Sequence, residues 1–447
     1  MFDGSVDARA TSVSSFAMPE HCRSTVASLA VVNGRVWRRP GATAVVLDGD
    51  RIAAVGAGRF DAARVIDAEG AWILPAFNDA HVHFLMASRS LGELDLFGIE
   101  TQPELELRVA GYARGHDGPW VVGRGWFYSA FPEGMPTVEL LDRLVPDRPA
   151  YLESFDAHTG WANSRALAIA GVTTRDVLRE AALLAVTRVM PIPTRELRLA
   201  FDLTPGRDFE VYARLRQDDD PWVSTGILKA FADGVVESKT AAMLHPYAGS
   251  DERGDPIWGP DELREAVHAA DARGWQVQVH AIGDAAIRQA LDAFEGTTPG
   301  RRHRVEHIES PDPADIPRFA RLGVIASMQP QHAAPAMVEV WRRHLGPERA
   351  ARGWPWKAIK ESGARLAFGT DWPVVPLDPM ASIAEAMRDL SLEDAVDAWT
   401  AGGAFAEHAE SRKGELREGL AADIAIVDFE SAQVKATVVG GRLVYEG

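Results

Sequence analysis

The chain has 447 residues, and 47 Lys and Arg against 64 Asp and Glu give a formal net charge of −17. Hydrophobic residues make up 46% and charged residues 25%, which excludes low-complexity and collagen-like chains. The acidic balance argues against a general nucleic-acid-binding or anionic-membrane surface. The single cysteine, Cys22, excludes an intramolecular disulfide framework, a Cys-rich zinc module and an iron–sulfur cluster. The length fits a large barrel with a satellite domain.

The first 28 residues are small and polar, and they carry Asp3 and Asp7 where a secretory signal would carry positive charge. No apolar run approaches the roughly 20 residues that a membrane helix needs. We therefore expect residues 1–28 to form a disordered tail on a cytoplasmic protein. We expect a small-molecule substrate as partner, no nucleic acid and no membrane, and the sequence is compatible with a homo-oligomer.

Both ends of the chain show short alternating strands separated by turn residues. The predicted strands are residues 29–32, 35–37, 44–48 and 51–55 near the amino end, and 423–427, 437–439 and 442–445 near the carboxyl end. Between them, Asn33-Gly34, Gly49-Asp50 and Gly440-Gly441 are typical of hairpin turns. The simplest assembly is one composite β-sandwich built from residues 29–75 and 412–447.

The middle of the chain alternates strands with helices, which is typical of βαβ units and a parallel sheet. The predicted strands are residues 72–76, 120–123, 150–154, 226–231, 276–280, 304–307, 324–328 and 365–368. The clearest helices are residues 261–273, 284–294 and 312–322. An alternation of this length predicts an α/β fold with a TIM-type (β/α)8 barrel, whose active site lies at the carboxyl ends of the strands.

Potential metal ligands follow several of these strands. His81 and His83 come after the first strand, and residues i and i+2 of a strand share a face, so both imidazoles can point at one centre. Alone, this pair is equally compatible with two polar residues at a strand exit. His280, His307 and Asp371 end three later strands. Because barrel strand ends converge on one mouth, the set predicts a site for Zn2+ or a similar divalent ion.

Lys229 stands among the apolar residues of the strand at 226–231. A buried ammonium is costly unless it is paired or neutralised. One interpretation pairs Lys229 with Asp233 or another carboxylate. The other makes it a lysine that has reacted with CO2 to form a carbamate, and the residues alone do not favour this second interpretation.

Seven ordered motifs resemble the amidohydrolase superfamily, specifically its type-3 branch, which includes N-substituted formamide deformylases. The matching segments are residues 75–83, 158–167, 229–234, 280–284, 303–307, 329–332 and 369–374. Residues 413–416 and 419–423 match the return strand of the branch's β-sandwich. The resemblance runs from about residue 29 to residue 447 and is specific for both superfamily and branch.

The resemblance implies a distorted barrel at residues 76–411, with a lobe inserted at about residues 85–170, and a centre of one or two metal ions. The metal ligands that it implies are His81, His83, Lys229, His280, His307 and Asp371. His81, His83 and Asp371 would hold the more buried ion, His280 and His307 would hold the second, and the carbamate on Lys229 would bridge the two ions. Asp371 would also be the general base.

Residues 172–225 depart from the branch pattern, which carries a longer segment containing the second barrel strand. Residues 181–190 or 197–203 are alternatives for that strand. In another arrangement, the strands at 120–123 and 150–154 belong to the inserted lobe rather than to the barrel. The departure affects the strand count and the closure of the barrel, but it removes no metal ligand.

Several further residues have weaker signals. His158 and Trp161 resemble substrate-facing positions of the inserted lobe, although a histidine bonded to the backbone is an equally good interpretation of His158. Gln329 and His332 follow the seventh strand and are expected at the mouth, whereas His303 precedes its strand and is expected to be structural.

Some tryptophans, namely Trp126, Trp161 and Trp372, fall near the expected mouth and would either line a pocket or pack in the core. Gly123-Arg124-Gly125 is not a nucleotide loop, because no phosphate-binding pattern continues from it into a helix.

The favoured function is a metal-dependent hydrolase of a non-peptide C–N bond in an N-substituted amide or formamide, acting through a metal-activated hydroxide. Asp371 would move the proton from the hydroxide to the leaving amine, and His332 or His158 would steady the oxyanion. The alternatives are a lactone, ester or imine hydrolase with the same metal site, and a non-catalytic metal-binding protein with a shortened barrel.

Overall fold

The computed structural model describes residues 26–58, 60–83, 87–88, 90–132, 134–173, 178–179, 200–203, 209–215 and 225–447. The chain forms two compact units, the first made of residues 1–77 and 407–447 and the second of residues 78–406. The expected tail at residues 1–28 falls largely outside the described residues. Its last two residues already belong to the first strand, which begins at Ala27.

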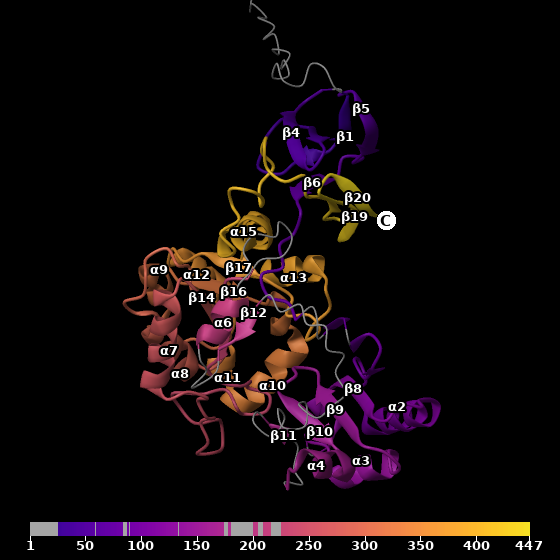
Figure 1. Cartoon of the computed structure of the whole chain (residues 1–447), viewed down its shortest axis with the longest axis vertical. Helices are drawn as coiled ribbons and strands as arrows, with labels where there is room; N and C mark the ends of the chain where they lie inside the picture. Colours follow the sequence, from indigo (N-terminus) through magenta and orange to yellow (C-terminus); the bar gives the residue numbers. More distant parts are fainter. Residues whose placement is uncertain are drawn as a thin grey trace, which may run out of the picture. The chain divides into compact units, whose positions relative to one another are not determined.

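The first unit contains two sheets (Figure 1). One has the order β4-β3-β1-β5 and consists of β1 (Ala27–Val32), β3 (Ala44–Asp48), β4 (Arg51–Gly56) and β5 (Ala62–Asp67). The other has the order β2-β6-β18-β19-β20 and consists of β2 (Arg35–Val36), β6 (Trp72–Pro75), β18 (Ile424–Asp428), β19 (Gln433–Val439) and β20 (Arg442–Glu446). Both β1 and β18 are apolar and buried along most of their length.

Strands from both ends of the chain therefore share one sheet, because β6 pairs antiparallel with β18. The hairpins predicted at Gly49-Asp50 and Gly440-Gly441 are confirmed. The hairpin predicted at Asn33-Gly34 is wrong, since β1 and β2 enter different sheets. These pairings define each sheet but not the packing of one sheet on the other, so the face-to-face sandwich stays a prediction.

The second unit is organised around a parallel sheet with the order β12-β13-β14-β15-β16-β17. Its strands are β12 (Ala200–Asp202), β13 (Ile227–Phe231), β14 (Gln276–Ala281), β15 (Arg304–His307), β16 (Ile325–Met328) and β17 (Leu366–Phe368). The central strands β14, β15 and β16 are buried along their whole length, as is expected of a parallel sheet covered on both faces. Because all six strands are parallel, their carboxyl ends lie along one edge.

Helices connect the strands of this sheet or follow its last strand, β17. They are α6 (Phe209–Leu215), α7 (Pro260–Ala272), α8 (Asp284–Phe294), α9 (Ile316–Leu322), α10 (Pro335–Leu345), α11 (Pro347–Ala350), α12 (Trp356–Glu361), α13 (Pro379–Ala386), α14 (Leu392–Asp397) and α15 (Gly403–Ala406). Two further helical turns are η3 (Pro330–Ala333) and the π-helical η4 (Ala398–Gly402). The amphipathic α8 buries Ile287, Leu291 and Phe294, and α9 ends at Gly323, whose φ of 64° fits a left-handed cap.

The described residues contain no closed eight-stranded barrel, so the prediction of barrel closure is not met there. The strand predicted at residues 72–76 is β6, and it belongs to the first unit instead. Of the two alternatives for the second barrel strand, residues 197–203 contain β12, which pairs parallel with β13. The other, residues 181–190, lies outside the described residues.

An inserted lobe contains the strands predicted at 120–123 and 150–154, so they are not barrel strands. Its sheet has the order β11-β10-β9-β8-β7, from β7 (Leu94–Asp95), β8 (Val121–Trp126), β9 (Ala150–Ser154), β10 (Thr159–Ala162) and β11 (Leu178–Arg179). Its helices are α2 (Gln102–Gly115), η2 (Tyr128–Ala130), α3 (Val138–Leu144) and α4 (Ser164–Ala170).

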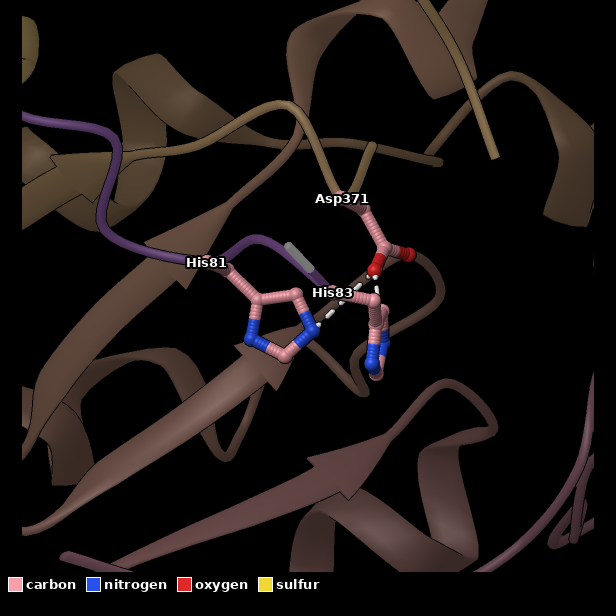
Figure 2. A group of neighbouring side chains, drawn as sticks. All are labelled: His81, His83 and Asp371. Atoms are coloured by element: carbon pink, nitrogen blue, oxygen red, sulfur yellow. Dashed lines mark ion pairs between the residues drawn. The ribbon is translucent and has the colours of Figure 1, made fainter. Parts of the chain in front are cut away.

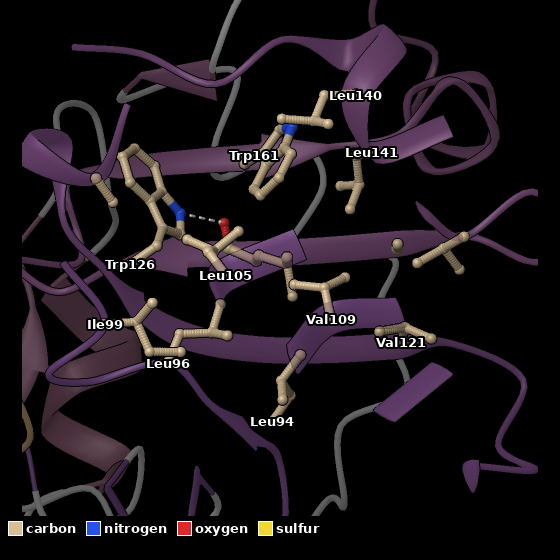
Figure 3. Packing of buried hydrophobic residues seen from close by; sticks show 14 of the residues in the cluster. Leu94, Leu96, Ile99, Leu105, Val109, Val121, Trp126, Leu140, Leu141 and Trp161 are labelled. Carbon is tan, nitrogen blue, oxygen red and sulfur yellow. Dashed lines mark hydrogen bonds between the residues drawn. The ribbon is translucent and has the colours of Figure 1, made fainter. Parts of the chain in front are cut away.

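The core of the lobe is a buried apolar cluster that includes Leu96, Leu105, Val109, Trp126 and Trp161 (Figure 3). Burying side chains of this size supplies about 1.5–3 kcal/mol each, enough to give the lobe a core of its own. Across the part of the chain that the structure describes, no helix combines the length and the apolar character needed to cross a membrane.

Candidate metal centre

The segment that carries His81 and His83 lies beside the end of β17. It has irregular backbone, whereas the sequence predicted that these histidines follow directly from a barrel strand. Asp79 fixes it from within: its Oδ1 accepts the backbone N–H groups of His81 (3.1 Å) and Thr370 (3.0 Å), and its Oδ2 accepts the Thr370 hydroxyl (2.6 Å). The backbone N–H of Asp371 donates to the His81 carbonyl at 2.7 Å. These bonds bring three candidate ligands from distant parts of the chain into one place.

His81, His83 and Asp371 form the centre of the site (Figure 2). The Nε2 atoms of His81 and His83 each lie 3.1 Å from Oδ1 of Asp371. The side chains of His81 and Asp371 are almost fully buried, whereas His83 is partly exposed. Two imidazoles and one carboxylate converging in this way are a suitable ligand set for Zn2+.

His280, the last residue but one of β14, and His307, the last residue of β15, stand beside this group. The ring centroids of His280 and His307 are 4.5 Å apart, and those of His81 and His307 are 5.3 Å apart. His307 and Asp371 have φ values of 74° and 61°, a left-handed conformation that is strained for residues other than glycine. Strain of this kind gathers at functional sites, where the surrounding structure holds it in place.

Lys229 lies on β13 with only 5% of its surface exposed, and its Nζ has no hydrogen-bond partner among the described residues. Burial lowers the pKa of Lys229 to about 8, against the opposing charges of Glu306 and Asp371. Asp233 is not its ion-pair partner, because this carboxylate accepts backbone N–H bonds from three other residues: Ala242, Ile282 and Gly283. A neutral amine is the form that reacts with CO2.

A metal ion fits this donor set, because several buried polar atoms converge without hydrogen bonds. They are Nε2 of His81, Nζ of Lys229, Nδ1 of His307, Nε2 of His332 and Oδ1 of Asp371. Buried polar atoms are normally satisfied, so a group of them pointing at one another indicates a missing ligand. His307, Glu309 and His332 form a second group of converging ligand atoms, whereas the predicted pairing of His280 with His307 is seen only as a ring contact.

The protonation states also suit cation binding. Burial holds the pKa of His280 and of His307 well below its usual value, so both imidazoles are neutral and keep a lone pair. Burial alone would raise the pKa of Asp371, but His81 and His83 outweigh it and hold that pKa well below its usual value. The carboxylate is therefore ionised at neutral pH.

The sequence reasoning missed the residues that orient His81. Nδ1 of His81 lies 3.1 Å from Oε2 of Glu306, and Arg304 pairs with Oε1 of Glu306 at 2.8 Å. Burial would raise the pKa of Glu306, but Arg304 and His81 lower it. Their signal was present in the sequence, because Arg304 and Glu306 are two apart on a strand and so share a face.

His332 and His158, the two candidates for steadying an oxyanion, approach the centre from different sides. Nε2 of His332 lies 3.7 Å from Oδ2 of Asp371, and its Nδ1 lies 2.9 Å from Oε1 of Glu309. The ring of His158 lies 5.0 Å from that of His280. Gln329 is also buried, and both polar atoms of its amide lack partners in the described residues.

Other residues that the sequence analysis named pack in the protein core, away from the candidate ligands. Trp161 is not substrate-facing: it is buried in the lobe core, and its Nε1 donates to the Thr137 carbonyl at 2.8 Å. Trp126 is also core, donating to Leu152 at 3.0 Å (Figure 3). His303 packs flat on Phe294, with ring centroids 4.9 Å apart, away from the ligands, as expected.

The model of the amidohydrolase family known as Amidohydro_3 matches residues 64–188 and 179–445. The chain therefore belongs to this amidohydrolase family, as its motifs implied. Protein LONG AFTER FAR-RED 3 of Arabidopsis thaliana is 27% identical, over 94% of this chain and 92% of its own. The putative amidohydrolase YtcJ of Bacillus subtilis is 26% identical, over 85% and 90%.

The N-substituted formamide deformylase of Arthrobacter pascens is 22% identical, over 94% of this chain and 98% of its own. Two solved structures of uncharacterised metal-dependent hydrolases are also similar. The one from Pyrococcus horikoshii has a TM-score of 0.70 and 21% identity, over 93% of this chain and all of its own. The one from Pyrococcus furiosus has a TM-score of 0.67 and 24% identity, over 88% and 97%. These neighbours imply a TIM-barrel-like fold.

Proposed function

We propose that the chain hydrolyses the C–N bond of an N-substituted amide or formamide at the His81, His83 and Asp371 centre. The observation that carries the proposal is the convergence of both imidazoles on one carboxylate oxygen, 3.1 Å from each. The similarity to an N-substituted formamide deformylase supports this substrate class.

The residues that would hold metal are His81, His83 and Asp371, with His280, His307 and a carboxylated Lys229 available for a second ion. Zinc is the ion that this mixture of imidazole and carboxylate suits best. When bound, the ion supplies a Lewis acid and lowers the pKa of water toward neutrality.

Asp371 is the general base. It is ionised and buried, and its Oδ2 faces His332 while its Oδ1 faces the two histidines of the centre. The carboxylate takes a proton from the attacking water and delivers it to the nitrogen of the departing amine, which is otherwise a poor leaving group.

His332 is placed to donate to the oxygen of the tetrahedral intermediate. Burial lowers the pKa of His332, but the hydrogen bond and charge of Glu309 outweigh it, so the pKa is raised. When protonated, the ring is a donor at both nitrogens, and Nδ1 is already taken by Glu309. Nε2 remains for the oxyanion, and His158 offers a second donor from the lobe.

A substrate panel tests the proposed function. The zinc-supplemented protein is assayed on N-benzylformamide and other N-substituted formamides and amides, beside matched esters and lactones. We expect amide hydrolysis, with Asp371→Asn reducing kcat about 10²- to 10⁴-fold. The exposed Asp389 supplies a matched control, Asp389→Asn, which should retain full activity. Hydrolysis of esters or lactones alone would move the proposal to the alternative substrate class.

A further inference from the structure

The loop that joins β9 to β10, residues 155–158, carries His158 from the lobe toward the metal centre. The centroid of the His158 ring lies 5.0 Å from that of His280 and 6.3 Å from that of Phe231. Phe231 ends β13, and His280 is its register partner on β14. At this loop the lobe therefore meets the strand ends that carry candidate metal ligands.

The two rings beside His158 are held by the parallel sheet. Nε2 of His280 lies 3.1 Å from the carbonyl oxygen of Gly234, and the ring centroids of His280 and Phe231 are 5.1 Å apart. Because these two rings come from paired strands, they form a fixed surface. The position of His158 against this surface depends on its own loop.

The carboxylate of Asp156 holds the loop from within. Its Oδ1 accepts the backbone N–H of His158 at 3.1 Å and also the Ser154 hydroxyl. Its Oδ2 accepts the Tyr128 hydroxyl at 3.0 Å. Asp156, Ser154 and Tyr128 are all buried, so water competes little for these bonds. Since every partner is a donor, a side chain that only accepts suits this place.

Tyr128 connects the loop to the core of the lobe. Its hydroxyl lies 2.8 Å from Oγ1 of Thr159, which donates to it because the tyrosine proton is given to Asp156. The Tyr128 ring packs in the apolar cluster of the lobe, with its centroid 5.1 Å from that of Trp126. The backbone N–H of Thr159 donates to the Ser154 hydroxyl at 3.0 Å. The loop is thus anchored at both ends.

The backbone of the loop is strained at Ala157, whose φ of 61° is a left-handed conformation that residues with a Cβ rarely adopt. Such strain persists only where neighbouring interactions hold it. The bonds to Asp156 lie on either side of Ala157, because they come from Ser154 and from His158. Removing the Asp156 carboxylate should therefore let the loop relax and move His158.

We infer that Asp156 is a positioning residue, which holds His158 against His280 so that the imidazole is placed to donate to the oxyanion. The donor role of His158 rests on the proposed function, and the inference goes beyond it by assigning a residue of the lobe to the reaction. Asp156 acts through the backbone of His158 and contacts no reacting atom.

A double-mutant cycle tests this coupling on the best substrate of the panel. We expect His158→Ala to lower kcat about 10²-fold, which is the cost of one oxyanion donor, and Asp156→Ala to lower it about 10-fold with little change in KM. The double variant should be no slower than His158→Ala alone, because Asp156 acts only through that ring. Losses that multiply would overturn the inference, since a purely structural aspartate acts independently of His158.

Asp142 on α3 of the same lobe supplies the matched control, because its carboxylate accepts the Ser164 backbone N–H at 2.8 Å. Asp142→Ala should leave kcat near the wild-type value in the presence and in the absence of His158. The conservative variant Asp156→Asn keeps an acceptor for the His158 N–H and should stay within about threefold of wild type, against the full loss in Asp156→Ala. An asparagine variant as slow as the alanine variant would contradict a positioning role.

Histidine NMR separates this inference from the proposed function, because it needs no turnover. The metal-loaded protein is labelled with ¹³C in its histidine rings, and the His158 signal is identified by its absence from His158→Ala. The signal should shift or broaden in Asp156→Ala, because His158 leaves its place beside two aromatic rings, and it should stay unchanged in Asp156→Asn and Asp142→Ala. If Asp156→Ala does not fold, Tyr128→Phe replaces it and should give a smaller shift. An unmoved signal would refute the positioning role even in an active amidase, and a moved signal would support it even if no amide were hydrolysed.

Discussion

Glu306 lies directly behind His81, with its Oε2 3.1 Å from the Nδ1 of that imidazole. A carboxylate this close to Nδ1 favours the tautomer with its proton on Nδ1, so that Nε2 keeps its lone pair for the centre. Glu306 is itself held by Arg304, whose Nε donates to Oε1 at 2.9 Å. The orientation of His81 is thus set by Glu306, and the position of Glu306 is set in turn by Arg304.

Replacing Glu306 with glutamine should weaken metal binding. Glu306→Gln keeps the shape of the side chain but removes the charge that fixes the tautomer of His81 and balances Arg304. We expect about a 10- to 100-fold loss of zinc affinity, the usual effect of removing such a partner. Competition with a chromophoric chelator measures it. Glu339→Gln, at an exposed position on α10, is the control, and equal affinity in both variants would show that Glu306 does not orient His81.

Lys229 should carry a carbamate in the active protein. A charged ammonium beside the histidines proposed to bind metal would repel the ions, whereas a carbamate is negative and supplies two oxygens. In protein equilibrated with ¹³C-bicarbonate, we expect a carbamate carbon signal that is absent from Lys229→Ala. The variant should also hold less metal and lose most of its activity, and short carboxylic acids should partly restore both. A wild type that is active and metal-loaded with no carbamate signal would refute the assignment.

His303 should make the protein less stable in acid. Its Nδ1 accepts the Val277 N–H at 3.0 Å, and burial, opposed by the charge of Asp271, lowers the pKa of His303 to about 4. Because the folded state binds this proton less readily than the unfolded one, the stabilisation is complete above about pH 6.5 and is lost as the pH falls toward 4.

The free energy of unfolding should therefore fall more steeply between pH 6.5 and pH 4 in the wild type than in His303→Gln, by up to about 3 kcal/mol. Denaturant titrations at both pH values measure the difference. Parallel pH profiles for the two proteins would show that His303 is not protonated on unfolding in this range.

Removing residues 413–447 should make the protein insoluble. The deletion removes β18, β19 and β20, and it leaves β6 paired only with β2, which exposes a sheet edge and its apolar face. Removing only residues 441–447, which include the exposed edge strand β20 (Arg442–Glu446), should be tolerated. The soluble fraction and the melting temperature measure the effect, and a soluble, cooperatively unfolding long truncation would contradict it.

Local patterns predicted most of the parallel sheet. The strand at residues 304–307 and the helix at residues 284–294 have the predicted bounds, because burial on both faces and an amphipathic period are local properties. The pairing partners were harder to predict. β6 looks like any buried strand, and only its contacts with β18 place it in the first unit.

Only the part of the candidate site that lies in sequence motifs could be predicted, because the rest depends on contacts between distant segments. His81, His83 and Asp371 could be identified by their motifs, and the structure brings them together. Glu306 and Glu309 belong to no ligand pattern, and their roles depend on distances between side chains from different strands and loops. The irregular backbone at His81 is set by the hydrogen bond between Asp79 and Thr370, which are 291 residues apart. The local sequence pattern therefore could not predict it.

Metal content measured by mass spectrometry tests the central claim most directly. The wild type and the variants His81→Asn, His83→Asn and Asp371→Asn are expressed with zinc, freed of loose metal by gel filtration and analysed per chain. We predict about one to two zinc ions in the wild type and a large loss in each variant, with His344→Asn, which lies outside the centre, unchanged. Full metal content in all three variants, or a metal-free wild type with full amidase activity, would contradict a catalytic metal centre at these residues.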